Sequence, residues 1–182
     1  MISDQLTLFE DPKFKNKIKN VDYVDLSTVP DDPARSKYGN GDFQYKNLPV
    51  GKYFIFKKGG YNMYRPKQGN IFPYVQNQFT GKILNASSTL TDFYPKVGLS
   101  GDENGKKCKI ISRIHRLVGL AFFTLPDTFY TSKNYWVVNH IDRTKVNYEI
   151  SNLEWVTQKD NCNTGKNNSA DVQAKIKKYI FS

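Results

Sequence analysis

A histidine and three asparagines near the carboxyl end of the chain have side chains suited to hydrolytic chemistry. His140 ends an apolar run and directly follows Asn139, and Asn152 and Asn161 come 12 and 21 positions after it. A histidine, with an ordinary pKa of ~6.5, can take a proton from water at neutral pH. Asparagine oxygens are hard ligands that suit Mg²⁺ or Mn²⁺, and such an ion can stabilise charge that develops on a phosphate. Asn139 and Asn161 are therefore the candidate pair of metal ligands.

Two short strands and a helix are predicted to position these side chains. The segments "YWVVN" and "LEWVT" each have the pattern of a strand. Thr157 then caps a short helix, with Asp160 as a weak capping box and Gly165 as the stop. In this order of strand, long loop, strand and helix, the end of the first strand can meet the helix. We therefore expect His140 and Asn161 to converge.

Each candidate also has an ordinary structural interpretation. His140 could be a loop histidine satisfied by a neighbour, and Asn161 could be a solvated helix residue. Asn152 could be an Asx-turn residue that precedes a strand, which is compatible with holding a loop in place.

The segment "SRIHRLVGLAFF" has apolar residues at helical spacing and predicts one amphipathic helix, closed by Leu125-Pro126. His115 lies beside its apolar stripe, and we favour packing or a phosphate contact together with Arg116 over a second catalytic role. Trp136 and Trp155 are most simply core aromatics of the two strands.

The rest of the chain divides by composition into three parts. Residues 1–45 lack sustained periodicity and indicate an arm or linker. Residues 46–125 are β-rich, with strands expected at "YFIF", "FPYVQN", "GKILN" and "YPKVGLS" and a hairpin at Asn104-Gly105. Residues 166–182 form a basic tail or short helix, whose Lys175, Lys177 and Lys178 are either a solvated face or a contact to a nucleic-acid backbone.

The composition favours one domain, with or without extensions, that meets a polyanion. The 182 residues include 27 Lys and Arg against 17 Asp and Glu, giving a net charge of +10. Such a balance is typical of nucleic-acid binding, although it can also serve solubility alone. Cys108 and Cys162 are too few and too far apart for a zinc site or a disulfide framework. Free thiols, no run of apolar residues long enough to span a membrane and no signal peptide lead us to expect a soluble intracellular protein.

The stretch "VNHIDRTKVNYEISNLEWVTQKDN" resembles the His-Asn-His/Asn (HNH) motif of phage and viral homing endonucleases, which belong to the ββα-metal or His-Me finger nucleases. The usual family run is V-N-H-I-D-G-N-K-x-N-N followed by N-L-E-W-V-T-x-x-x-N. The matching positions are Val138, Asn139, His140, Ile141, Asp142, Lys145, Asn147, Asn152 to Thr157 and Asn161. Upstream, "PYVQNQFTGKIL" is similar to part of the small module called NUMOD4. The likeness covers about residues 46–163.

The resemblance implies an α+β fold, with a β-rich NUMOD4-like module at 46–125 and a ββα-metal core at 126–165. It implies a metal-dependent DNA endonuclease from a phage or large DNA virus, cutting one or both strands. His140 would be the general base, Asn152 would orient it by tying down the loop, and Asn139 and Asn161 would hold a single Mg²⁺ or Mn²⁺. Basic residues near the site, Arg143, Lys145 and Arg116, would contact DNA.

Two departures from the family run concern the loop. Arg143-Thr144 replaces Gly-Asn and so removes a residue suited to a left-handed turn, and Tyr148 replaces the second Asn. The alternative function is therefore a catalytically silent HNH-fold subunit that binds nucleic acid or takes part in an assembly. In either case, sequence specificity would call for a partner protein or complex.

Overall fold

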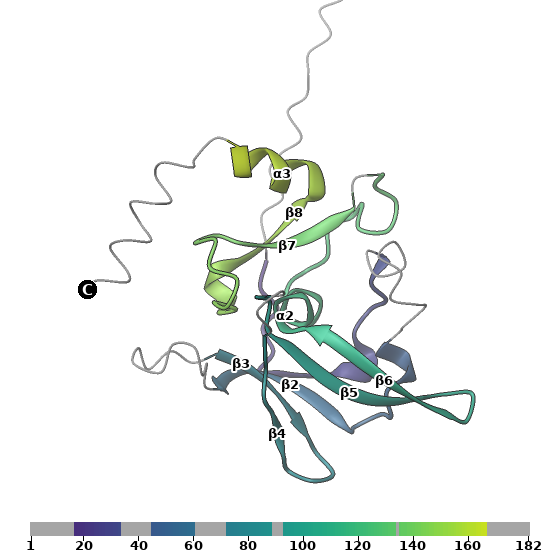
Figure 1. Ribbon diagram of the computed structural model, residues 1–182. Coiled ribbons are helices and arrows are strands. Elements are labelled where there is room, and N and C mark those ends of the chain that lie inside the picture. Colours follow the sequence, from purple (N-terminus) through teal and green to yellow (C-terminus); the bar gives the residue numbers. More distant parts are fainter. Residues whose placement is uncertain (1–16, 34–44, 61–71, 89–92, 134, 167–182) are drawn as a thin grey trace, which may run out of the picture.

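The chain has an α+β fold, as the sequence predicted. The computed structural model describes residues 17–33, 45–60, 72–88, 93–133 and 135–166 (Figure 1). None of the helices within these ranges is long and apolar enough to cross a membrane. The buried side chains form one apolar cluster that runs from the amino-terminal strands to the carboxyl-terminal ones.

The predicted β-rich region forms two antiparallel sheets, one of which also takes in a strand from the amino-terminal segment. β1 (Tyr23–Asp25), β2 (Tyr53–Gly60), β3 (Phe72–Asn77) and β4 (Ile83–Leu84) pair in that order. β5 (Lys96–Glu103) and β6 (Lys106–Arg113) form a separate hairpin. Its turn is the predicted Asn104-Gly105, whose φ angles of 53° and 80° are those of a left-handed two-residue turn. The strands expected in this region are thus confirmed.

The predicted amphipathic helix is α2 (Ile114–Phe122), and its whole apolar stripe is buried. It ends three residues before the expected Leu125-Pro126. β7 (Trp136–His140), β8 (Leu153–Thr157) and α3 (Gln158–Lys166) complete the fold. α2 packs against β2, β6, β7 and β8, so one helix connects the β-rich region to the carboxyl-terminal hairpin (Figure 1).

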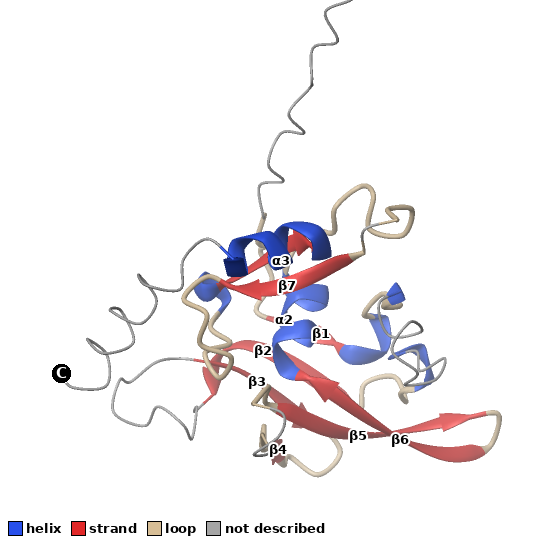
Figure 2. Ribbon diagram, turned by 45° about the horizontal axis from the view of Figure 1, so that its top comes forward, coloured by secondary structure: helices blue, strands red, loops and turns tan. Residues whose placement is uncertain are grey.

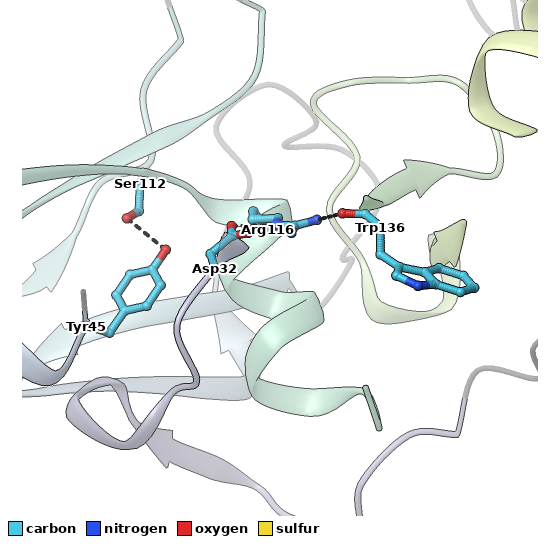
Figure 3. A network of polar contacts seen from close by, with 5 residues as sticks. All are labelled: Asp32, Tyr45, Ser112, Arg116 and Trp136. Atoms are coloured by element: carbon cyan, nitrogen blue, oxygen red, sulfur yellow. Dashed lines mark hydrogen bonds and ion pairs between the residues drawn. The ribbon is translucent and has the colours of Figure 1, made fainter. Parts of the chain in front are cut away.

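The amino-terminal segment differs from the arm or linker that the sequence indicated. Residues 17–33 contribute β1 and the short 3-10 helix η1 (Leu26–Thr28), and Leu26 and Val29 are buried in the core. The backbone of Lys19 donates to the carbonyl of Phe122 at 2.7 Å. Only a few apolar side chains anchor this segment to the core. The sequence therefore shows no apolar periodicity that would predict its secondary structure. A second short 3-10 helix, η2 (Tyr45–Asn47), buries Tyr45 against Ser112 (Figure 3).

Arg116 is a structural residue, and this corrects its expected role as a DNA contact. Its guanidinium donates to both carboxylate oxygens of Asp32, at 2.7 and 2.5 Å, and to the carbonyl of Trp136 at 2.7 Å (Figure 3). The ring of Trp155 lies 4.6 Å from the guanidinium. The side chains of Arg116 and Asp32 are only 11% and 1% exposed. The guanidinium therefore braces three segments of the fold instead of facing a ligand.

Replacing Asp32 with Asn should lower the free energy of unfolding by about 3 kcal/mol, because it leaves the Arg116 charge buried without its counter-charge. Urea unfolding followed by tryptophan fluorescence measures the change. Asp127→Asn, at an exposed position, is the matched control and should stay within about 0.5 kcal/mol of the wild type. Equal stabilities of the Asp32 variant and the wild type would contradict the bracing role.

Candidate active site

The carboxyl-terminal hairpin and helix have the predicted order of strand, loop, strand and helix. β7 and β8 pair antiparallel, with His140 opposite Leu153 and Asn139 opposite Glu154. The predicted cap is present, since the Asp160 amide donates to Thr157 Oγ1 at 3.2 Å and that hydroxyl donates to Asp160 Oδ2 at 2.6 Å. α3 continues through the expected stop at Gly165 and ends at Lys166.

The two faces of this hairpin carry different helices. Successive side chains of a strand point to opposite faces. Val138 and Trp155 point to the face covered by α2, where Gly119 approaches so closely that a Cβ atom on it would lie 2.6 Å from Val138. α3 packs against the other face of both strands (Figures 1 and 2). His140 therefore faces α2, and Asn139 and Glu154 face α3. The predicted convergence of His140 with Asn161 is not found, because Asn161 belongs to α3 and His140 points to the opposite face.

His140 is enclosed on its face of the hairpin. The residue is 5% exposed, and its ring nitrogen Nε2 has no hydrogen-bond partner among the described residues. The rings of His115 and Tyr94 lie 4.9 and 5.7 Å away between centroids. His115 also packs on Tyr94, at 4.7 Å, which agrees with the packing role expected for it.

Burial sets the protonation state of the His140 ring. Desolvation lowers its pKa to about 4, with a further lowering from Lys145 and an opposing effect from Asp142. The imidazole is therefore neutral at pH 7, which is the form that can accept a proton.

Asn152 holds together the loop between the two strands. Its Oδ1 accepts from the Asp142 amide at 2.9 Å, and its Nδ2 donates to Asp142 Oδ1 and to the Asn147 carbonyl, both at 2.8 Å. Asn147 Nδ2 in turn donates to Asp142 Oδ2 at 2.7 Å. Side-chain amides thus fix the loop that follows His140. Asn152 is buried and cross-links this loop through its hydrogen bonds.

The two departures from the family run are accommodated in different ways. Arg143 adopts a left-handed conformation with φ 61°, so the turn is kept although glycine is absent. Its amide donates to the His140 carbonyl at 2.9 Å. Tyr148 is buried and packs edge-on against Phe72 at 5.0 Å. The loop thereby gains an anchor on the four-stranded sheet where the family has a polar residue.

The proposed metal ligands lie on or above the face that α3 covers. Asn139 Nδ2 donates to Glu154 Oε1 at 2.9 Å, which directs that nitrogen away from any ion and leaves Oδ1 as the ligand atom. Asn161 is half-buried and is the fourth residue of α3. The described residues contain no group of three or more His, Cys, Asp or Glu side chains that could hold a metal. Amide oxygens are nonetheless hard donors, so Asn139 and Asn161 fit Mg²⁺ or Mn²⁺.

Two of the basic residues expected to contact DNA lie on the loop between the strands, and one of them contacts an aromatic ring. Arg143 and Lys145 are exposed on the loop. The Lys145 ammonium lies 5.1 Å from the ring of Tyr94, a residue that the sequence did not single out. No pattern in the sequence links Tyr94 to the motif, because the contact joins distant segments. Three further candidates lie outside the described residues: Lys175, Lys177 and Lys178.

Comparison with known proteins confirms the resemblance in sequence. No protein-family model matches the chain. A curated relative, an uncharacterized HNH endonuclease of Acanthamoeba polyphaga mimivirus, is 34% identical over 95 residues, which cover 52% of this chain and 24% of the relative. The chain thus matches only about a quarter of the length of this giant-virus relative. The likeness of the upstream segment to NUMOD4 stays a prediction.

A solved structure described as DNA binding and cleavage by the HNH homing endonuclease I-HmuI is also similar to the chain. The identity is 22% and the TM-score 0.43, over 86% of this chain and 67% of the other.

Acidification should destabilise the protein through His140. The folded-state pKa of about 4 lies below the ordinary 6.5, so between these values the unfolded chain binds more protons. The stability contributed by the neutral buried ring is complete above pH 6.5 and is lost as the pH falls toward 4, by up to about 3 kcal/mol. Urea unfolding across this range should show a steeper pH dependence in the wild type than in His140→Gln. Parallel curves for the two proteins would refute the buried neutral state.

Proposed function

We propose that the chain is a metal-dependent DNA endonuclease of the HNH type that hydrolyses phosphodiester bonds. The observation that carries the proposal is a neutral histidine with an unpartnered Nε2 at the end of β7. It directly follows Asn139, which lies on the face packed against the helix that bears Asn161. Hydrolysis of a phosphodiester requires a base for water and stabilisation of the phosphate charge, and this arrangement supplies candidates for both.

The residues of the chain divide the work between them. His140 accepts a proton from the attacking water at Nε2. Asn139 and Asn161 would hold one Mg²⁺ or Mn²⁺ through their amide oxygens, and the bound ion would supply charge stabilisation at the scissile phosphate and its leaving oxygen. Asn152 keeps the loop after His140 in place through Asp142. Arg143 and Lys145, which are exposed on the loop, would contact the DNA backbone. Such contacts position the duplex without reading its sequence.

The same proposal includes three further points. Residues 126–165 are the nuclease core, the carboxyl-terminal lysines contact DNA, and the protein originates in a phage or large DNA virus. A mimivirus relative that carries the HNH name supports it. A partner protein would supply sequence specificity, since backbone contacts by themselves do not discriminate between bases.

A catalytically silent nucleic-acid-binding subunit is the second candidate. The burial of His140 favours it, because a base must reach both water and phosphate, whereas this residue is only 5% exposed. Cleavage of a plasmid in the presence of Mg²⁺, Mn²⁺ or a chelator separates the two functions. A nuclease nicks or linearises the plasmid only with the metal ion, and a silent subunit leaves it intact throughout.

Replacing His140 with Ala should reduce plasmid cleavage on the order of 10²–10⁴-fold, the usual effect of losing a general base. DNA affinity, measured by fluorescence anisotropy, should stay nearly unchanged because the ring acts in the chemical step. His140→Gln fills more of the buried space and should be equally inactive, and circular dichroism checks that both variants fold. Wild-type cleavage rates in either folded variant would exclude His140 as the base.

Replacing Arg143 with Gly should affect stability and DNA binding in opposite directions. Relief of the left-handed strain, about 1–2 kcal/mol, exceeds the entropy cost of glycine, so the free energy of unfolding should rise by roughly 0.5–1 kcal/mol. Loss of one phosphate contact should make the plot of log K against log salt shallower by about 0.9. Lys106→Gln, at the distant tip of the β5–β6 hairpin (Figure 1), controls for the loss of charge. An unchanged salt slope in the Arg143 variant would remove this residue from the DNA contacts.

A further inference from the structure

Glu154 is an acidic residue in direct contact with Asn139, one of the proposed metal ligands. It lies opposite Asn139 in the β7–β8 register, and its Oε1 accepts from Asn139 Nδ2 at 2.9 Å. Both side chains are half-buried, on the face that α3 covers. In the sequence, Glu154 lies in a predicted strand and matches a position of the HNH motif, but neither observation assigns it a role.

The hydrogen bond has a direct consequence for metal binding. A side-chain amide carries one acceptor oxygen and one donor nitrogen, and only the oxygen can ligate a hard cation. An amide that is free to turn presents the oxygen part of the time. A carboxylate cannot donate, so it accepts only from the nitrogen of Asn139 and thereby fixes which end of the amide remains for an ion.

The lack of charge on the two proposed ligands also points to Glu154. Magnesium sites in proteins usually contain one or two carboxylates, whereas Asn139 and Asn161 are both neutral. Glu154 brings a negative charge to within hydrogen-bond distance of Asn139. Groups that hold the ligands of a metal typically change its affinity on the order of 10–100-fold when they are removed.

We propose that Glu154 is the positioning residue of the metal site, which fixes Asn139 with its Oδ1 toward the ion and supplies the carboxylate charge that the two amides lack. The inference rests on the proposed function, because it assigns Glu154 to that same metal site. Its rival is a plain cross-strand pair that contributes only to the stability of the hairpin.

Binding of Mn²⁺ to the full chain without DNA, followed by electron paramagnetic resonance, tests the inference without relying on catalysis. Glu154→Ala should weaken Mn²⁺ binding on the order of 10–100-fold. Glu154→Gln can still accept from Asn139 but has lost the charge, so its affinity should lie between those of Glu154→Ala and the wild type. Glu103→Ala is the matched control, since Glu103 is also a strand residue paired across a hairpin, with Lys106. The control should bind Mn²⁺ like the wild type.

A second substitution separates positioning from a purely structural role. An aspartate offers oxygen at both ends and carries its own charge, so it needs no carboxylate to orient it. Asn139→Asp should therefore restore Mn²⁺ affinity in the Glu154→Ala background. In the wild-type background it should weaken the hairpin, because two carboxylates would then face each other across the strands. Affinity within about twofold of the wild type in Glu154→Ala, or no recovery in the double variant, would overturn the proposal.

Plasmid cleavage by the same proteins distinguishes failure of the inference about Glu154 from failure of the proposed function. A wild type that binds Mn²⁺ and cleaves, together with Glu154→Ala that does both equally well, overturns the inference alone. A wild type that neither binds Mn²⁺ nor cleaves overturns the proposed function, and the inference with it.

Discussion

The close packing of α2 on one face of the β7–β8 hairpin is the constraint on which the site depends. Gly119 allows it, because any side chain there would meet Val138 and Trp155 at 3.1 Å or less. With that face filled, α3 takes the other one (Figure 2). The alternation of the strand then assigns His140 and Asn139, although they are neighbours in sequence, to opposite sides of the hairpin.

Hydrogen bonds within the loop between β7 and β8 fix the backbone that follows His140. Asn152, Asp142 and Asn147 satisfy one another's polar groups, so the backbone after His140 has little freedom. The left-handed Arg143 is the exception, since a side chain in that conformation costs about 1–2 kcal/mol that glycine would avoid. Keeping arginine at such a position is understandable if its charge serves DNA, and the buried Tyr148 offsets the strain by tying the loop to Phe72.

Much of this could be predicted from the sequence, and the parts that could not have physical reasons. Helical periodicity gave α2, and the Thr157 cap gave the start of α3, because both signals are local. Arg116 was misread because its partner Asp32 lies 84 positions away and charge alone does not reveal whether a guanidinium is buried. Glu154 was missed because the residue opposite Asn139 depends on the register of the hairpin, which a long loop leaves open.

The enclosure of His140 presents the remaining tension in the site. Burial lowers the pKa of the ring to about 4, which keeps it neutral but makes it a weak base. Lys145 acts in the same direction and Asp142 opposes it. An anion brought beside the ring favours the protonated form and raises the pKa. Within the proposed function, a phosphate held by Arg143 and Lys145 would supply such a charge and would also neutralise the effect of Lys145 on the ring. His140 would then become a better base only when DNA is present, so the low pKa of the ring in the free protein is compatible with catalysis.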